Sequence, residues 1–245
     1  MAKKIKFSRY NYKDIRGIIK SKPKKLIFSF MNANDIYCFS KDKDFQKSVT
    51  DPKMNRITSV DGTTTAIVLS IKNFQRVKRL TGPELTDKIF KDQDVIDSKK
   101  HFFIGVDESD LVKIREKYPL LKQKKMSGYN PPYVKGTHFS AQEVQKMVKI
   151  INKFKPDFLW IGIGCPKQEI LAYDLYDKIN PSCIFNVGAA LQYIQGTQKR
   201  APKFFRSLGL EWLYRLFKEF KLTSKKLWNS MIGTIIGFFL IKLDQ

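Results

Sequence analysis

Residues 162–169, with the sequence GIGCPKQE, combine features that suit an anionic ligand. They directly follow the predicted strand DFLWI and precede a sequence with helical periodicity. Glycine lets the backbone approach a ligand closely, and the first turn of a helix offers free N–H groups that favour negative charge. The segment therefore indicates a site for a nucleotide diphosphate. A tight turn between a strand and a helix that binds no ligand is the alternative, because such turns use glycine as well.

Two other polar positions follow β-prone runs. The run LIFSFMNANDIYCF is interrupted by polar residues from Asn32 onward, and it predicts a buried strand that ends at a loop facing a ligand. A second unit of this kind, residues 57–70, carries Asp61 and Gly62 at a turn. Function is expected at that turn, although Asp-Gly is also common in turns that have no function.

The elements that position these residues alternate along the chain. Strands are predicted at HFFIGV, DFLWIGIG and SCIFNVGA, and helices at TGPELTDKIF, DESDLVKIREKYP, EVQKMVKIINKFKP and QEILAYDLYDKI. Repeated alternation of strand and helix is typical of a parallel sheet with helices on both faces. The sequence therefore predicts an α/β fold.

The chain is strongly basic, with 46 Lys plus Arg against 23 Asp plus Glu and a formal net charge of +23. Such a charge attracts anions over long distances, which makes nucleic acid, anionic lipid or a diphosphate substrate the expected partners. A lysine-rich composition throughout the proteins of the organism would also account for much of the excess.

Cysteine and histidine are too few and too scattered for a zinc site or a disulfide framework. The three cysteines, Cys38, Cys165 and Cys183, form no CxxC pair, and only two histidines occur. The basic N-terminus is not followed by an apolar run, so no secretory signal is predicted. We therefore expect the protein in a reducing cytoplasm and without a bound metal.

The sequence changes character after Gln198, where basic residues alternate with large aromatic ones at helical spacing. The uncharged stretch 227–241 has 15 residues, which is short of the roughly 20 that a membrane-spanning helix needs. It is expected to lie at an interface or to dock on protein. We therefore predict a core over residues 1–198 and a basic, aromatic-rich helical appendage over residues 199–245.

Several motifs in consecutive order resemble the WecG/TagA/CpsF glycosyltransferase family. They are MNA at residues 31–33, VDGTTTAIVLS, RLTGPEL, FFIGV, GYNPPY, GIGCPKQE, NVGAALQYIQGTQKRAP and LGLEWLYRL, and together they span roughly residues 25–226. The resemblance implies a Rossmann-like core and an inverting, metal-independent transferase without a cofactor. It also implies a UDP-sugar donor that carries N-acetylmannosamine, its uronic acid, glucose or glucuronic acid. The implied acceptor is a sugar linked to undecaprenyl diphosphate, in cell-surface polysaccharide biosynthesis.

The resemblance assigns roles to individual residues. Asp61 matches the aspartate proposed as general base, since an acceptor hydroxyl must lose its proton as it attacks. The residues expected at the donor are Asn32, Arg79, Thr81, Gly82, Gly162, Gly164, Pro166, Lys167, Gln168, Glu169 and Gln192. Those expected at the diphosphate or the membrane are Arg200, Arg206, Arg215, Lys221, Lys225 and Lys226. A solvated helix face is the alternative for any single one of these arginines.

This chain departs from the family pattern at three places. Phe30 replaces a common threonine, Gln192 replaces a common aspartate, and lysines replace C-terminal arginines. Lysine keeps the charge but loses the bidentate geometry of arginine. These changes put the donor contacts in doubt and favour general attraction to an anionic membrane surface over a specific phosphate clamp.

Other functions compete with the transferase interpretation. A nucleic-acid-binding protein would explain the charge, but no known nucleic-acid motif is present. A nucleotide-dependent oxidoreductase would need a complete dinucleotide fingerprint, which is missing, and a catalytically degenerate family member stays open. The expectation is an enzyme on the inner face of the cytoplasmic membrane, with a UDP-sugar and a polyprenyl-diphosphate-linked acceptor as partners, without nucleic acid, and as a possible oligomer.

Overall fold

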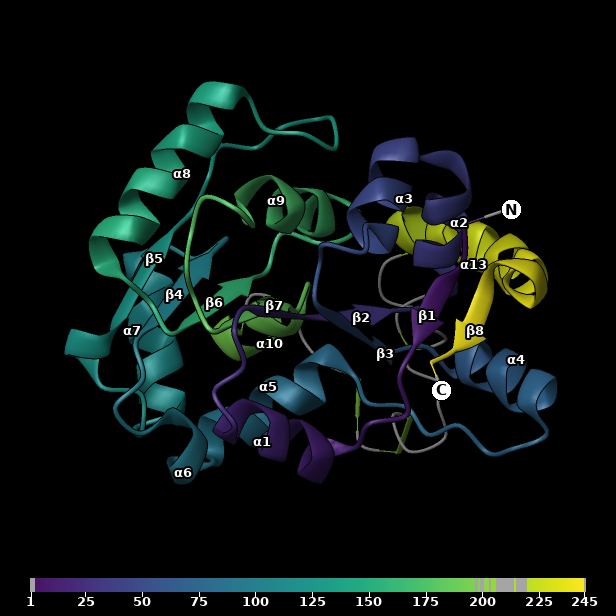
Figure 1. Cartoon of the computed structure of the whole chain (residues 1–245), viewed down its shortest axis with the longest axis horizontal. Coiled ribbons are helices and arrows are strands. Elements are labelled where there is room, and N and C mark those ends of the chain that lie inside the picture. Colours follow the sequence, from purple (N-terminus) through teal and green to yellow (C-terminus); the bar gives the residue numbers. More distant parts are fainter. Residues whose placement is uncertain are drawn as a thin grey trace.

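The computed structural model describes residues 3–196, 198, 201–202, 204–205, 214 and 220–244, and a six-stranded parallel sheet lies at its centre (Figure 1). The strand order is β3-β2-β7-β6-β4-β5. The strands are β2 (Leu26–Met31), β3 (Arg56–Val60), β4 (His101–Ile104), β5 (Met126–Tyr129), β6 (Phe158–Ile161) and β7 (Cys183–Asn186). All neighbouring pairs in this sheet are parallel, which confirms the predicted α/β fold.

Helices cover both faces of the sheet. One face packs against α1 (Tyr12–Lys20), α5 (Gly82–Lys91), α6 (Gln93–Ile96), α7 (Glu108–Lys117) and α10 (Ala190–Gln195). The helices above the other face in Figure 1 are α2 (Ala33–Lys41), α3 (Lys43–Thr50), α8 (Ala141–Phe154) and α9 (Lys167–Leu175). Near β3 lie α4 (Thr63–Asn73) and α13 (Phe220–Leu240), and a short 3-10 turn, η1 (Gln123–Lys125), precedes β5.

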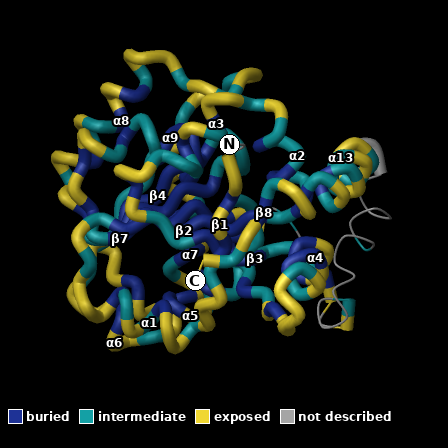
Figure 2. The backbone as a smooth tube through the Cα atoms, turned by 45° about the vertical axis from the view of Figure 1, so that its right-hand side comes forward, coloured by how far each residue is buried: buried dark blue, intermediate teal, exposed yellow. Residues whose placement is uncertain are grey.

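The four inner strands β2, β7, β6 and β4 are buried on both sides, and they form the dark blue centre of Figure 2. On one side a row of rings crosses four strands in register, formed by Phe28, Phe185, Trp160 and Phe103. The ring centroids of Trp160 and Phe185 are 4.2 Å apart and the rings are stacked. Burial on both faces explains why these strands are continuous apolar runs in the sequence rather than alternating ones.

Most of the predicted elements are confirmed, but two segments expected to continue as loops or β-prone runs are helical. After Asn32 the chain enters α2, because Asn32 and Asp35 form a capping box at its first turn. After Gly62 the chain enters α4, although its sequence is rich in threonine and β-branched residues. Burial of Val68 and Leu69 on α4 outweighs that intrinsic preference.

The two ends of the described chain meet in a second, two-stranded sheet. Strand β1 (Ile5–Phe7) pairs in parallel with β8 (Ile241–Leu243), directly after α13. Helix α13 packs on α2 so closely that a Cβ added to Gly233 would lie 1.8 Å from the carbonyl oxygen of Ala33. None of the helices in the described ranges is long and apolar enough to cross a membrane. The boundary expected at residue 198 stays a prediction.

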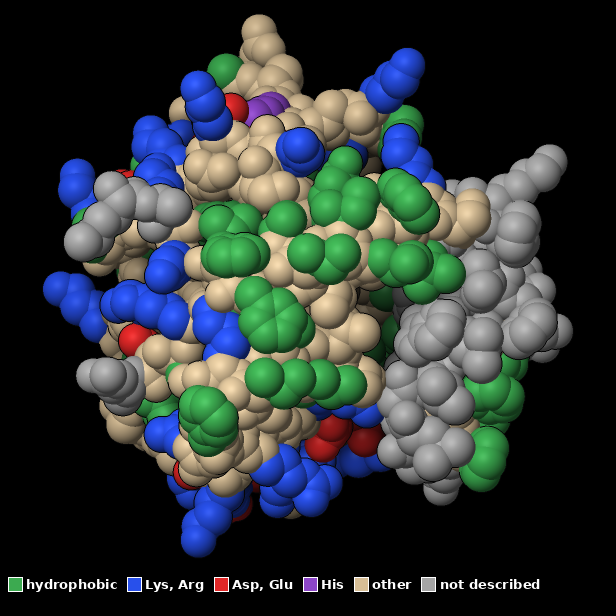
Figure 3. Space-filling view, turned by 90° about the vertical axis from the view of Figure 1, so that its right-hand side faces the viewer, with side chains coloured by type: hydrophobic (Ala, Val, Ile, Leu, Met, Phe, Trp, Pro, Cys, Tyr) green, Lys and Arg blue, Asp and Glu red, His purple; other side chains and the backbone are tan. Residues whose placement is uncertain are grey.

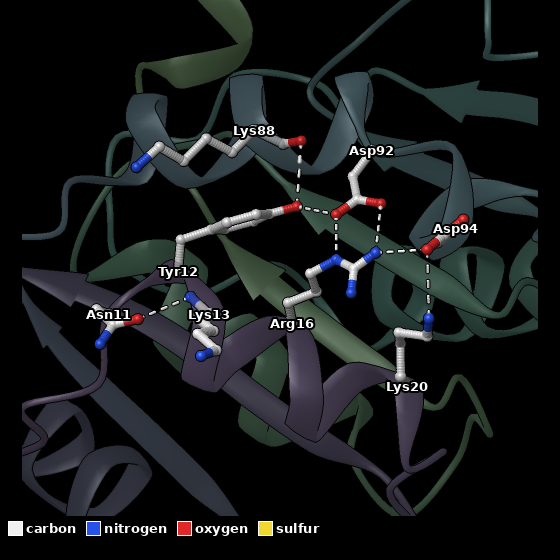
Figure 4. A network of polar contacts seen from close by, with 8 residues as sticks. All are labelled: Asn11, Tyr12, Lys13, Arg16, Lys20, Lys88, Asp92 and Asp94. Carbon is white, nitrogen blue, oxygen red and sulfur yellow. Dashed lines mark hydrogen bonds and ion pairs between the residues drawn. The ribbon is translucent and has the colours of Figure 1, made fainter.

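Helix α1 is fastened to α5 and α6 by a polar network (Figure 4). The guanidinium of Arg16 pairs with Asp92 at 2.6 Å and also with Asp94. The hydroxyl of Tyr12 donates to Asp92 at 2.7 Å, and burial raises the pKa of this tyrosine, with the carboxylate adding to the shift. These groups satisfy one another and belong to the scaffold rather than to the site described next.

Candidate active site

Two adjacent strands bring Asn32 and Asp61 together at the carboxyl edge of the sheet. Met31 and Val60 are partners in the parallel register. Asn32 directly follows Met31 at the end of β2, and Asp61 directly follows Val60 at the end of β3. The backbone N–H of Asp61 donates to the carbonyl of Met31 at 3.0 Å. A Cβ on Gly62 would lie 2.9 Å from the Cβ of Asn32, so only glycine permits this close approach.

The carboxylate of Asp61 is held by the first turn of α5. The N–H of Gly82 donates to Asp61 Oδ1 at 3.1 Å, and Thr81 caps the helix by accepting from the N–H of Glu84. A helix N-terminus stabilises negative charge placed on it. Both Asp61 and Thr81 are half-buried, so this carboxylate is positioned by the fold and is not sealed inside it.

A continuous series of contacts joins Asp61 to the glycine segment at residues 162–169. A Cβ on Gly82 would lie 3.1 Å from the carbonyl of Val187, so the start of α5 lies against the segment that follows β7. The N–H of Gly188 in turn donates to Gln168 Oε1 at 3.0 Å. The structure therefore brings Asp61 and the glycine segment to the same edge, with the ends of β2 and β7 between them.

The two glycines of that segment have different surroundings. A Cβ on Gly162 would lie 2.5 Å from the side chain of Leu191, so this glycine allows α10 to pack against the end of β6. Gly164 has φ +84 and nothing within 4 Å of an added Cβ, which leaves its backbone open to a ligand. Pro166 precedes α9, and the ammonium of Lys167 donates to the carbonyl of Val134 at 2.6 Å.

Gln168 and Glu169 are too deeply buried to touch a ligand in this structure. Their exposed fractions are 2% and 0%, and Gln168 Nε2 donates to Glu169 Oε1 at 2.9 Å. With its other amide atom engaged by Gly188, Gln168 ties the end of β6 to the end of β7. The geometry thus gives these two side chains a positioning role at the expected donor site.

Several buried polar groups lie beneath this edge. Burial raises the pKa of Glu169 to about 7 and that of Asp35 to about 6. Across the described ranges, Glu169 Oε2, Thr65 Oγ1, Asn186 Oδ1 and the Nε of Arg56 are buried without a hydrogen-bond partner. Arg56, Thr65 and Asn186 were not expected at the site, because the sequence gives no sign of which polar side chains point into the interior.

The remaining expected site residues fall into two groups. Arg79 is half-buried and Gln192 is exposed on α10, while Lys225 and Lys226 are exposed on α13. Lys221 lies on α13 and its side chain is outside the described part, as are Arg200, Arg206 and Arg215 altogether. Phe30, one of the departures from the family pattern, is buried and would be 3.4 Å from a Cβ on Gly82.

Helix α13, which carries Lys221, Lys225 and Lys226 expected at the diphosphate or the membrane, lies next to Asn32 of the expected donor site. Its Gly233 contacts the first turn of α2, and Asn229 Nδ2 donates to Asn34 Oδ1 at 3.5 Å. Because Asn32 caps that turn, a shift of α13 would move the backbone next to Asn32.

Comparisons with known proteins identify the family of this chain and several relatives. Residues 4–245 match the family described as the glycosyl transferase WecG/TagA/CpsF family. Proteins of Staphylococcus aureus strains MW2, MRSA252 and NCTC 8325, each named N-acetylglucosaminyldiphosphoundecaprenol N-acetyl-beta-D-mannosaminyltransferase, are 31% identical over 147 residues. These matches cover 58% of the chain and 54% of each relative, so the similarity spans about half the length of those relatives.

The match to the family extends over nearly the whole chain, and the described motifs that begin at Met31, Val60 and Gly162 lie at the carboxyl edge of a parallel sheet. Relatives that are 31% identical to this chain are named as transferases. The chain therefore belongs to the glycosyl transferase WecG/TagA/CpsF family.

Proposed function

We propose that this enzyme transfers N-acetylmannosamine from a UDP-sugar to an N-acetylglucosamine linked to undecaprenyl diphosphate. The acceptor and the transferred sugar come from the printed names of the relatives. The UDP donor comes from the family resemblance and from the open backbone at Gly164. The uronic acid of N-acetylmannosamine, glucose and glucuronic acid are the other donor sugars that the family resemblance allows.

One observation carries the proposal. Asp61 follows β3 and lies beside Asn32, and its Oδ1 accepts from the N–H of Gly82. In the proposed reaction this carboxylate takes the proton of the acceptor hydroxyl while the hydroxyl oxygen bonds to the anomeric carbon. The bond from that carbon to the UDP oxygen breaks at the same time. Attack from the face opposite to the leaving diphosphate inverts the configuration.

The leaving diphosphate needs a positive partner. Lys225 and Lys226 are exposed on α13, the helix that contacts the first turn of α2, and Arg200, Arg206 and Arg215 precede this helix in the chain. Ion pairs between such groups and phosphate oxygens are stronger than neutral hydrogen bonds. We propose that these cations act in place of a metal ion, and that no cofactor takes part. Transfer should then persist in the presence of a chelator.

Replacing Asp61 with Asn tests the assignment of the base, because asparagine keeps the size of the side chain and cannot accept the proton. Release of UDP in the presence of the lipid-linked acceptor should fall about 10²–10⁴-fold, with KM for the donor little changed. Thermal stabilisation of both proteins by a panel of UDP-sugars would identify the donor, since a ligand that binds the native state raises its stability.

Undiminished turnover of Asp61→Asn would remove Asp61 as the base. Absence of any transfer by the wild-type protein across the panel would instead favour a catalytically degenerate member. Tighter binding to DNA than to the substrates at physiological salt would support the nucleic-acid alternative. Action on a lipid-linked acceptor also implies work at the inner face of the cytoplasmic membrane, which is part of the same proposal.

A further inference from the structure

Large apolar side chains are exposed together on α4 and α13. We call this set the apolar face, and it comprises Ile67, Ile71 and Phe74 from α4 and its end, with Ile235, Phe238 and Phe239 from α13. Phe74 is 99% exposed and Phe239 is 72% exposed. The spacing along each helix places the side chains on one side of it. Trp228 and Met231 extend the stripe toward the start of α13.

The two helices form one continuous surface. The ammonium of Lys72 on α4 donates to the carbonyls of Phe238 and Ile241, which fixes the end of α13 against α4. A Cβ on Gly237 would lie 3.9 Å from Val68, so the helices also touch through their inner sides. Figure 3 shows hydrophobic side chains gathered across this side of the molecule, with basic side chains around them.

The surroundings of the apolar face are basic. No Asp or Glu occurs in residues 63–80 or in residues 220–243. The basic residues described in these segments are Lys72, Arg76, Lys78, Arg79, Lys225, Lys226 and Lys242. The next acidic residue after α13 and β8, Asp244, lies 3.8 Å from the ammonium of Lys6. The charge carried by these two segments is therefore of one sign.

That charge decides between the possible occupants. A second copy docking symmetrically on this face would bring two basic rims together, and like charges oppose such contact. An anionic lipid surface complements the rim, while aromatic and aliphatic side chains enter the boundary between headgroups and acyl chains. We propose that the apolar face of α4 and α13 is the surface with which the enzyme lies on an anionic bilayer.

This surface is coupled directly to the proposed catalytic residue. Helix α4 begins at Thr63, immediately after Asp61 and Gly62, and its 11 residues extend about 16 Å. Helix α13 meets the first turn of α2 at Gly233, next to Asn32. The diphosphate of the proposed acceptor lies among the lipid headgroups. Docking through both helices therefore fixes the distance between Asp61 and the headgroups. This role for α4 rests on the proposed function. The membrane contact was expected from residues 199–245 alone, and here it also includes α4, a helix of the predicted core.

A triple variant, Ile67→Ser, Ile71→Ser and Phe74→Ser, tests the surface without touching site residues. Binding would be measured by co-sedimentation with vesicles of phosphatidylglycerol and phosphatidylcholine, and with vesicles of phosphatidylcholine alone. Wild-type protein should prefer the anionic vesicles, and the variant should bind them at least tenfold more weakly. A double variant on the other helix, Phe238→Ser and Phe239→Ser, should behave alike. The matched control, Tyr10→Ser with Leu120→Ser, removes exposed apolar side chains elsewhere and should bind as the wild type does.

Transfer would be followed with an acceptor on the full polyprenyl chain in vesicles and with a short-chain, water-soluble acceptor. The triple variant should lose transfer to the vesicle acceptor in parallel with binding and stay within twofold of wild type on the soluble one. Equal vesicle binding by wild type and both variants would overturn the proposal, as would a wild-type dimer that both variants dissociate without weaker vesicle binding. An equal loss on the soluble acceptor would show a structural defect and would also overturn it. If the wild type transfers to neither acceptor, the proposed function fails, and the vesicle measurement still decides the surface.

Discussion

Two aspartates lie at opposite ends of the central sheet and differ in what surrounds them. Asp157, at the amino end, accepts from the N–H of Lys100 at 2.8 Å and lies 3.6 Å from the ammonium of Lys99, and its own carbonyl accepts from Ser182. Asp61, at the carboxyl end, accepts from the N–H of Gly82 and is followed by Gly62.

The same type of side chain has a structural role in Asp157 and a proposed catalytic role in Asp61. Asp157 joins the beginnings of β4, β6 and β7, so its interactions stabilise the sheet. Around Asp61 two glycines allow close packing, Gly62 against Asn32 and Gly82 against Val187, and the half-buried carboxylate is held by a backbone N–H rather than by cations. Substitutions at the carboxyl end should therefore change catalysis, and those at the amino end should change stability.

After the loss expected for Asp61→Asn, the largest effect is expected from Gly62→Ala. The added Cβ would lie 2.9 Å from the Cβ of Asn32, so the ends of β2 and β3 must move apart and carry Asp61 with them. A displacement of this kind near 1 Å can cost about 10²-fold in rate, and we expect kcat to fall 10–100-fold. The measurement is steady-state release of UDP.

Gly17→Ala is the matched control, because its Cβ would meet nothing within 4 Å on exposed α1. It should leave kcat unchanged and raise stability by about 1 kcal/mol, since alanine favours a helix over glycine. Unchanged kcat in Gly62→Ala would mean that the spacing of Asn32 and Asp61 does not matter.

A pH effect is expected from Glu169 beneath the carboxyl edge. Burial raises its pKa from 4.5 to about 7, so the folded protein binds a proton that the unfolded chain has already released over this range. The contribution of Glu169 to the free energy of unfolding should therefore be largest at and below about pH 4.5 and should decline as the pH rises to about 7. Asp35, with a pKa raised from 3.8 to about 6, adds a decline of the same sign at lower pH.

Glu169→Gln removes the titrating group and keeps its shape. Denaturation at pH 5 and pH 8 should show a smaller difference in unfolding free energy for this variant than for wild type, by about 1–3 kcal/mol. An equal difference in both proteins would contradict a raised pKa at this position.

The smallest effect is expected at the amino end. Asp157→Ala removes the acceptor of the Lys100 N–H and should lower the unfolding free energy by about 1 kcal/mol, with kcat unchanged within twofold. Asp97→Ala, which removes an exposed pairing with Lys122 at 3.9 Å, is the control and should change stability by less than about 0.5 kcal/mol. A tenfold loss of kcat in Asp157→Ala would erase the distinction between the two ends.

Much of the fold could be predicted from the sequence because local residue patterns indicate most of the strands and helices. The run FLWI is apolar throughout, as a doubly buried parallel strand should be, and Thr81 before Gly-Pro is a clear helix start. Helix α4 was not predicted, because its threonines and β-branched residues favour a strand until tertiary packing buries them. The pairing of β1 with β8 joins the two ends of the described chain, and no local pattern specifies a partner so distant.

The candidate site was predicted in part for similar reasons. Motifs placed Asp61, Asn32 and the glycine segment at strand ends, and parallel strands end at one edge. The sequence could not distinguish side chains that face a ligand from those that face the interior. Gln168 and Glu169 lie in the same motif as Gly164, yet both are buried, because Gln168 accepts from the N–H of Gly188 after β7 and donates to Glu169.

The most direct measurement is the amide spectrum of glycine-labelled protein titrated with the UDP-sugar that stabilises it most. The signals of Gly82, Gly164 and Gly188, which lie at the ends of three different segments along the carboxyl edge, should shift together with one binding constant. The signal of Gly17, which lies on exposed α1, should not move. A shift confined to Gly17, with Gly82 and Gly164 unchanged, would contradict a donor site at this edge.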